Sequence, residues 1–157
     1  MTNQGQPDLN VVLVEPEIHW NTGNAGRTCL AAGAQLHLVE PLAFSLAERE
    51  VRRAGLDYWQ RVRPCVWPSW TALEAALPTL GEPLFFDPDA ERTLWDADLR
   101  PPTALIFGPE TRGLAPSILE RYSQLAVRIP QVAGSVRSLN LSTCVGIAVY
   151  EALRQRR

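Results

Sequence analysis

The sequence predicts an α/β fold built on a mainly parallel sheet with helices on both faces. Two short apolar runs, Leu9 to Val14 and Ala104 to Phe107, have the composition of strands buried on both faces of a sheet. Both runs stop at proline turns, Glu15-Pro16 and Gly108-Pro109. Segments of helical periodicity alternate with the strand-like runs, and this alternation is typical of parallel sheets.

The first half of the chain is expected to alternate three strands with three helices. Polar residues 21–24 have the composition of a helix cap and turn. A helix with small inner residues should follow and stop at Gly33. Thr71 and Glu74 have capping-box spacing, and Pro78 should end their helix. The expected strands are 9–14, 35–40 and 61–67, and the expected helices are 25–32, 45–54 and 68–78.

The second half should complete the same pattern. Strands are expected at 84–86, 104–107 and 125–129, and helices at 116–122 and 138–154. The last helix carries an apolar stripe that predicts burial on one face. Residues 1–8 are expected to be a disordered lead-in, and residues 9–157 a single domain. That length suits one hydrophobic core. The apolar stripe of the last helix consists of Leu141, Cys144, Val145, Ala148 and Ala152.

Composition narrows the classes of protein. The net charge is only −2, and all 15 basic residues are arginines. Residues 49–63 hold more arginines than acids, so a basic face on an acidic protein is expected. The 3 cysteines form no Cys-x-x-Cys pair, which argues against a metal site or disulfide framework and favours a reducing cytoplasm. No apolar run reaches the ~18 residues of a membrane span.

Several common catalytic signatures are missing from the sequence. It contains no Gly-x-Gly-x-x-Gly, no phosphate-binding Gly-x-x-x-x-Gly-Lys and no Gly-x-Ser-x-Gly elbow. His19 and His37 are the only histidines. A lone histidine near a strand end is more often structural than a general base, so we expect neither to be catalytic.

Three polar segments remain, and each follows a predicted strand. They are Asn21 to Arg27, Gly108 to Gly113, and Arg137 to Ser142. Taken singly they are consistent with a helix cap, a turn and another helix cap. Because the carboxyl ends of parallel strands meet at one edge of a sheet, all three together indicate a ligand site there.

The three segments resemble the three motifs of the SPOUT class of RNA methyltransferases. Within that class the chain is similar to the TrmL-type group, which methylates the ribose of the wobble nucleotide of tRNA. Residues 52–58 and 149–152 match that group too, and the likeness spans about residues 9 to 154. The chain departs from it at His19-Trp20, where the group usually has a proline, in a longer loop at 130–136, and at residues 87–89.

This resemblance implies a deep trefoil knot in the C-terminal third, an exception to the rule that chains do not thread loops. It implies an obligate homodimer, S-adenosylmethionine as methyl donor, no metal, and the anticodon stem-loop of tRNA as substrate. The implied cofactor contacts are Phe86, Gly108, Ile129, Ser138 and Leu139. The implied catalytic residues are Arg27, Asn21, Glu110, Ser138 and Asn140. The expected RNA contacts are Arg49, Arg52, Arg53, Arg61, Arg63 and Tyr150.

By this correspondence Arg27 helps to activate the ribose 2′-hydroxyl. An arginine is a poor base because it stays protonated. Three roles are therefore open: an unusual pKa, orientation of the ribose, or stabilisation of developing alkoxide charge.

Three other functions are consistent with parts of the sequence. They are a SPOUT methyltransferase for ribosomal RNA, a knotted RNA-binding protein without activity, and an unrelated doubly wound nucleotide-binding domain. The joint presence of Arg27, Glu110, Ser138 and Asn140 argues against the inactive protein. The missing glycine motifs argue against the nucleotide-binding domain.

Overall fold

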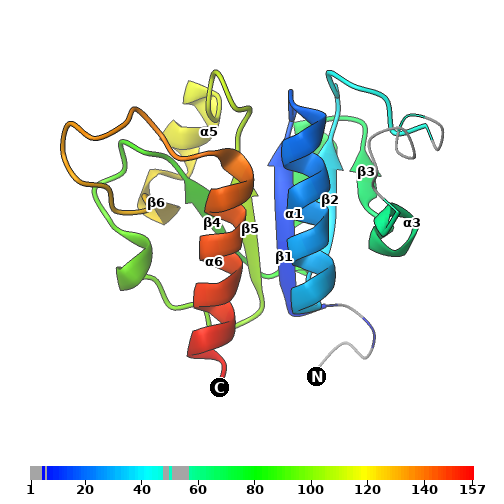
Figure 1. Ribbon diagram of the computed structural model, residues 1–157. Coiled ribbons are helices and arrows are strands. Elements are labelled where there is room, and N and C mark those ends of the chain that lie inside the picture. Colours follow the sequence, from blue (N-terminus) through cyan, green and yellow to red (C-terminus); the bar gives the residue numbers. More distant parts are fainter. Residues whose placement is uncertain (1–4, 6, 48–49, 51–56) are drawn as a thin grey trace.

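A computed structural model describes residues 5, 7–47, 50 and 57–157. Its centre is a six-stranded parallel sheet of order β3-β2-β1-β5-β4-β6 (Figure 1). The predicted parallel α/β sheet is confirmed. The strands are β1 (Leu9–Val14), β2 (Gln35–Val39), β3 (Cys65–Trp67), β4 (Glu82–Phe86), β5 (Thr103–Phe107) and β6 (Ala126–Val127).

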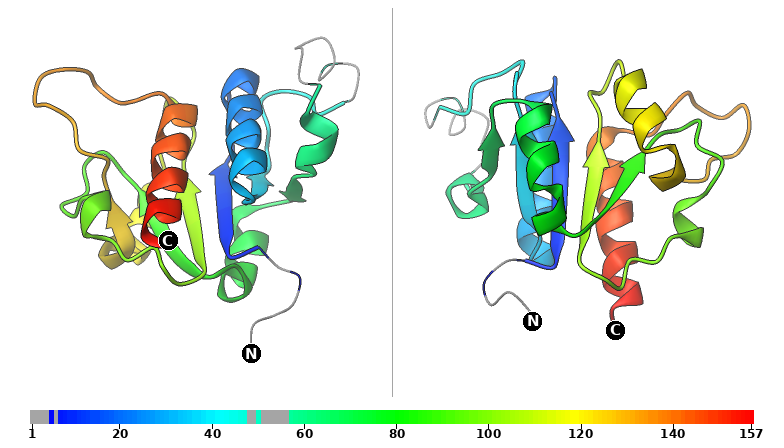
Figure 2. Two further views of the ribbon diagram at one scale, coloured as in Figure 1. Left: turned by 60° about the horizontal axis from the view of Figure 1, so that its bottom comes forward. Right: turned by 180° about the vertical axis from the view of Figure 1, so that it is seen from behind.

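Helices cover both faces of this sheet. Helix α1 (His19–Ala32) and helix α6 (Leu141–Gln155) lie side by side on one face, and α3 (Trp59–Val62) packs on α1. Helix α4 (Trp70–Leu80) and helix α5 (Pro116–Arg121) cover the opposite face (Figure 2). None of the helices in the described part of the chain is long and apolar enough to cross a membrane.

Strand alternation divides the core into two layers. Val11 and Leu13 of β1 pack in the layer under α1 and α6, whereas Val12 and Val14 pack in the layer under α4 and α5. All four are buried, which explains why β1 is a continuous apolar run. The predicted inner stripe of α6 is buried except at Cys144, which is half-buried.

Several element boundaries differ from the sequence-based expectation. Helix α1 begins at His19 rather than Ala25, so the predicted turn at 21–24 is helical. Helix α4 passes Pro78 and ends at Leu80, because Leu77 and Leu80 are buried and hold its last turn. Its cap is Ser69, whose Oγ accepts from the Ala72 amide at 3.2 Å, and not Thr71.

Other boundaries shift for reasons of packing. Residues 61–62, expected to begin the strand 61–67, instead end α3, because Trp59 and Val62 at helical spacing are buried against α1 at Gly26. The strand itself is shorter and forms β3. Strand β6 shortens to two residues after a 3₁₀ turn (Ser123–Leu125), and α6 begins at Leu141 rather than Ser138. Much of the helix expected over 45–54, and most of the lead-in 1–8, lie outside the described residues.

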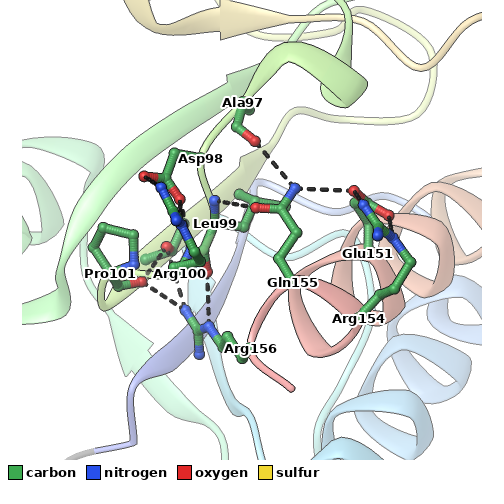
Figure 3. A network of polar contacts seen from close by, with 10 residues as sticks. Ala97, Asp98, Leu99, Arg100, Pro101, Glu151, Arg154, Gln155 and Arg156 are labelled. Carbon is green, nitrogen blue, oxygen red and sulfur yellow. Dashed lines mark hydrogen bonds and ion pairs between the residues drawn. The ribbon is translucent and has the colours of Figure 1, made fainter.

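The C-terminal end of α6 is fastened to the connection between β4 and β5 (Figure 3). The Arg156 guanidinium donates to the carbonyl oxygens of Leu99 and Pro101, both at 2.7 Å. The Gln155 side chain accepts from the Leu99 amide and donates to the Ala97 carbonyl. Burial lowers the pKa of Arg156 from its ordinary value. These bonds fix how α6 lies across the sheet.

His37, in β2, belongs to a buried chain of hydrogen bonds. Trp67 Nε1 donates to His37 Nδ1 at 3.1 Å, so the ring proton is on Nε2, which donates to Asn10 Oδ1 at 2.9 Å. Asn10 Nδ2 then donates to the Leu80 carbonyl at 2.8 Å. Burial lowers the pKa of His37 from 6.5 to about 4. The expectation that His37 is structural agrees with this fully paired, neutral ring.

We predict a pH-dependent loss of stability from His37. The folded-state pKa lies below the unfolded one, so the neutral ring stabilises the fold above pH 6.5, and this stability is lost as the pH falls toward about 4. The loss should be on the order of 3 kcal/mol in the free energy of unfolding. Urea unfolding across this pH range should show it in the wild type and not in His37→Gln. The exposed-histidine variant His19→Gln should behave like the wild type, and an equal slope in His37→Gln would contradict the prediction.

Candidate functional site

The carboxylate of Glu110 organises the carboxyl edge of the sheet. Glu110 follows β5, and it accepts hydrogen bonds from the backbone amides of Glu17 at 2.7 Å and Ile18 at 3.0 Å. Ile18 is the N-cap of α1 and has no capping side chain of its own. A carboxylate at a helix N-terminus satisfies free amides and interacts favourably with the helix dipole. Glu110 therefore explains why α1 starts at His19.

The same carboxylate begins a chain of side-chain bonds that reaches α6. Asn21 Nδ2 donates to Glu110 Oε1 at 3.2 Å, and Asn140 Nδ2 donates to Asn21 Oδ1 at 2.9 Å. Asn140 is the N-cap of α6, where its Oδ1 accepts from the Ser142 amide and from Ser142 Oγ. The buried Asn21 amide thus has its oxygen and nitrogen assigned by two partners. One residue from each of the three polar segments is joined in this chain.

A second bridge ties the loop after β1 to the loop after β5. The Glu17 carboxylate accepts from the Thr111 amide at 3.1 Å and from Thr111 Oγ1 at 2.7 Å. These hydrogen bonds lower the pKa of Glu17 from its ordinary value. The Glu17 amide donates to Glu110 and the Glu17 carboxylate accepts from Thr111, so each loop both donates to the other and accepts from it. Both loops are thereby held at the same edge.

Arg27 lies on a different side of α1 from Asn21. Its exposed guanidinium lies over the Tyr58 ring, with Cζ 5.7 Å from the ring centroid. Tyr58 in turn donates from its hydroxyl to the Gly23 carbonyl at 2.9 Å. Ser138 is exposed in the loop before α6. Within the described residues, neither Arg27 nor Ser138 hydrogen-bonds to the Glu110–Asn21–Asn140 chain.

The expected cofactor contacts come from neighbouring strand ends. Phe86 ends β4, Gly108 follows β5 and Ile129 follows β6, and β4 lies between the other two strands. Phe86 and Ile129 are half-buried, and the Phe86 ring stacks on Phe107 with centroids 4.3 Å apart. A side chain at Gly108 would collide with the backbone of Leu114, so the loop after β5 requires glycine there. Leu139 is half-buried just before α6.

The expected RNA contacts are only partly described. Arg49, Arg52 and Arg53 lie outside the described residues. Arg61 and Arg63 are exposed at the end of α3, and Tyr150 is exposed on α6. Among the described residues no group of His, Cys, Asp or Glu is arranged to hold a metal ion.

Sequence reasoning missed Glu17, Thr111 and Tyr58 as parts of the site. Thr111 lies inside a recognised segment, but its partner Glu17 stands in the loop after β1 with no signal beyond proximity to Asn21. Tyr58 lies within residues 52–58, which match the related group, and that match was the available signal, because its partner Arg27 is distant in the sequence.

A parallel α/β sheet whose carboxyl-edge loops are interlocked defines a ligand-binding domain of the doubly wound type. The sequence model of the SpoU rRNA Methylase family matches residues 8–150. The chain therefore belongs to the SpoU rRNA Methylase family.

Three comparisons illustrate the family. The chain is 45% identical to a tRNA (cytidine(34)-2′-O)-methyltransferase of Burkholderia pseudomallei, over 94% of this chain and 95% of that one. A solved structure concerned with the 2-OH methylation of C/U34 on tRNA has a TM-score of 0.85 and 44% identity, and the match covers 94% of this chain and 95% of that one. An rRNA methyltransferase from Sinorhizobium meliloti with bound AdoMet (S-adenosylmethionine, SAM) has a TM-score of 0.76 and 25% identity. The match covers 96% of this chain and 56% of that one.

We predict that Glu110→Gln destabilises the fold. The amide keeps the shape of the carboxylate, but its NH₂ group would face at least one of the N–H groups that now donate to Glu110. The free energy of unfolding should fall by about 2 kcal/mol, since hydrogen bonds to a charged group are lost. Urea unfolding measures it, with Glu120→Gln, an exposed position on α5, as control. Equal stabilities of the two variants would contradict the assigned role of Glu110.

Proposed function

We propose that this protein transfers a methyl group from S-adenosylmethionine to the ribose 2′-hydroxyl of the wobble nucleotide, C34 or U34, of tRNA. The observation that carries the proposal is the match to a tRNA (cytidine(34)-2′-O)-methyltransferase over nearly the full length of both chains. The bond chain through Glu110, Asn21 and Asn140 supports it, because it connects the three segments that such a site requires.

The residues at the ends of β4, β5 and β6 suit the cofactor. Phe86, Ile129 and Leu139 offer half-buried apolar surface, and Gly108 lets the loop after β5 turn back against the backbone of Leu114. With Ser138, these residues would hold S-adenosylmethionine, which supplies an electrophilic methyl group. The SAM-bound relative supports this assignment.

The protein's own part in the reaction is to position the ribose and to favour loss of the proton from its 2′-hydroxyl. Methyl transfer to a hydroxyl needs in-line placement, so positioning accounts for much of the rate. Arg27 is the proposed ribose-activating residue, and the Tyr58 ring holds its guanidinium in a fixed place on α1. A fixed cation favours the developing alkoxide charge. Asn21, Glu110, Asn140 and Ser138 shape the adjoining wall of the site.

The proposal includes the remaining properties implied by the family resemblance. The C-terminal part forms the deep trefoil knot, and the fastening of Arg156 and Gln155 to residues 97–101 is consistent with a threaded last helix. Two copies form the active enzyme, which sedimentation velocity at micromolar concentration can test. A tRNA substrate implies work in the cytoplasm.

Arginines of residues 49–63 and Tyr150 are the proposed contacts to the anticodon stem-loop. Arg61 and Arg63 are exposed and available for phosphate contacts. Their replacement should weaken binding of all RNA sequences alike.

The direct test is incubation with labelled S-adenosylmethionine and total tRNA, followed by mapping of ribose methylation. Methylation at nucleotide 34 is the expected result. Transfer only to ribosomal RNA would overturn the choice of substrate. Absence of transfer to any RNA, with cofactor binding intact, would overturn the activity and favour an RNA-binding protein.

We predict that Arg27→Ala keeps cofactor binding and loses turnover, by about 100-fold or more, which is typical for removal of one charge-stabilising donor. Calorimetry measures the binding and single-turnover methylation measures the rate. Arg121→Ala, an exposed arginine on α5, is the control. Loss of cofactor binding in Arg27→Ala would remove Arg27 from its proposed role.

A further inference from the structure

A group of aromatic rings is exposed at the start of α1. Trp20 is 54% exposed, and the His19 ring lies against it with centroids 4.5 Å apart and planes tilted by 39°. Phe44, from the segment after β2, packs against His19 with centroids 6.4 Å apart. We call His19, Trp20 and Phe44 the aromatic platform. His19 contacts Trp20 on one side and Phe44 backs His19, while the Trp20 side chain stays open to solvent.

The aromatic platform adjoins the candidate site in two ways. Trp20 directly precedes Asn21, the middle residue of the bond chain from Glu110 to Asn140. Trp20 is also seven positions before Arg27, and at 3.6 residues per turn the two side chains leave α1 in nearly the same direction. Both are exposed, as is Asn24 between them. The distance along the helix is about 10 Å, so one short stretch of RNA can reach both residues.

Charge at this edge decides which part of a nucleic acid fits the platform. The carboxylates of Glu17 and Glu110 lie in the loops beside it: Glu110 accepts from the Ile18 amide, next to His19, and the hydrogen bonds from Thr111 lower the pKa of Glu17. These acids repel a phosphate group. They do not repel the face of a neutral base, and an exposed tryptophan is well suited to stack on one.

We propose that Trp20 is the stacking surface for an unpaired nucleobase of the RNA loop that carries the target ribose. Arg27 then faces the sugar–phosphate side of the same stretch, while the base lies on Trp20. His19 and Phe44 are positioning residues that hold the indole. This proposal rests on the proposed function, since it assigns a base contact to the same RNA substrate.

The first test is RNA affinity, measured by fluorescence anisotropy with a labelled anticodon stem-loop. Trp20→Ala should weaken the Kd by at least about 5-fold, the lower end of what one base–aromatic stack contributes. Trp20→Phe should restore most of it. Trp95→Ala is the matched control, because Trp95 is 55% exposed in the acidic 3₁₀ turn Leu94–Asp96 and should have no role. The salt dependence of binding should keep its slope in Trp20→Ala, because no charge is removed.

The second test removes the base instead of the ring. Stem-loops with one abasic nucleotide at or beside position 34 should bind the wild type more weakly at a single position, and that loss should be absent in Trp20→Ala. Equal binding by the wild type, Trp20→Ala and Trp95→Ala would overturn the proposal. Loss of dimers in Trp20→Ala by sedimentation velocity would also overturn it and assign the platform to a second copy of the chain. Failure of the proposed function is measured separately, as the absence of methylation at position 34 by the wild type. If the wild type methylates that position, the outcomes above concern only the role of Trp20.

Discussion

The Glu110 carboxylate is the interaction on which the carboxyl edge of this fold depends. It accepts from two backbone amides at the start of α1 and from the Asn21 side chain. Without an acceptor at that position, the first turn of α1 would have unpaired amides in a loop that has no capping side chain. A strand end in one half of the sheet thus sets where a helix in the other half begins. Asn140 extends the same connection to α6.

This arrangement gives α1 two separate tasks. One side of the helix joins the polar chain through Asn21 and packs beside α6, and another side is exposed and carries Trp20 and Arg27. Tyr58 donates a hydrogen bond to the Gly23 carbonyl, and the Arg27 guanidinium lies over its ring. The proposed reaction needs a rigid wall for the cofactor and an open surface for RNA, and α1 borders both.

Burial explains which parts of the fold could be predicted from sequence. Strands β1 and β5 are continuous apolar runs because both faces are covered, so their positions were predicted within a residue. The start of α1 was not predictable, because its cap comes from Glu110, far away in the chain. Helix α3 was not predicted, and its residues 61–62 were expected to begin a strand, because the burial of α3 depends on contact with Gly26 rather than on local composition.

The site was predictable only in part for a similar reason. The three polar segments could be singled out from their places after strands, and their roles came from the family resemblance. Three features depend on how distant segments approach one another: the bonds between the segments, the bonds of Glu17 to Glu110 and Thr111, and the contact of Arg27 with Tyr58. The proposed roles of Arg27 and Ser138 stay predictions.

The central claim is that Glu110, Asn21 and Asn140 act as one unit that holds the three segments for methyl transfer. A double-mutant cycle between Glu110→Ala and Asn140→Ala, read out as the single-turnover rate of methylation of tRNA at position 34, tests it most directly. Because the two side chains meet only through Asn21, a shared unit predicts that the double variant is no slower than the slower single variant. Independent effects, in which the two losses multiply, would contradict the account.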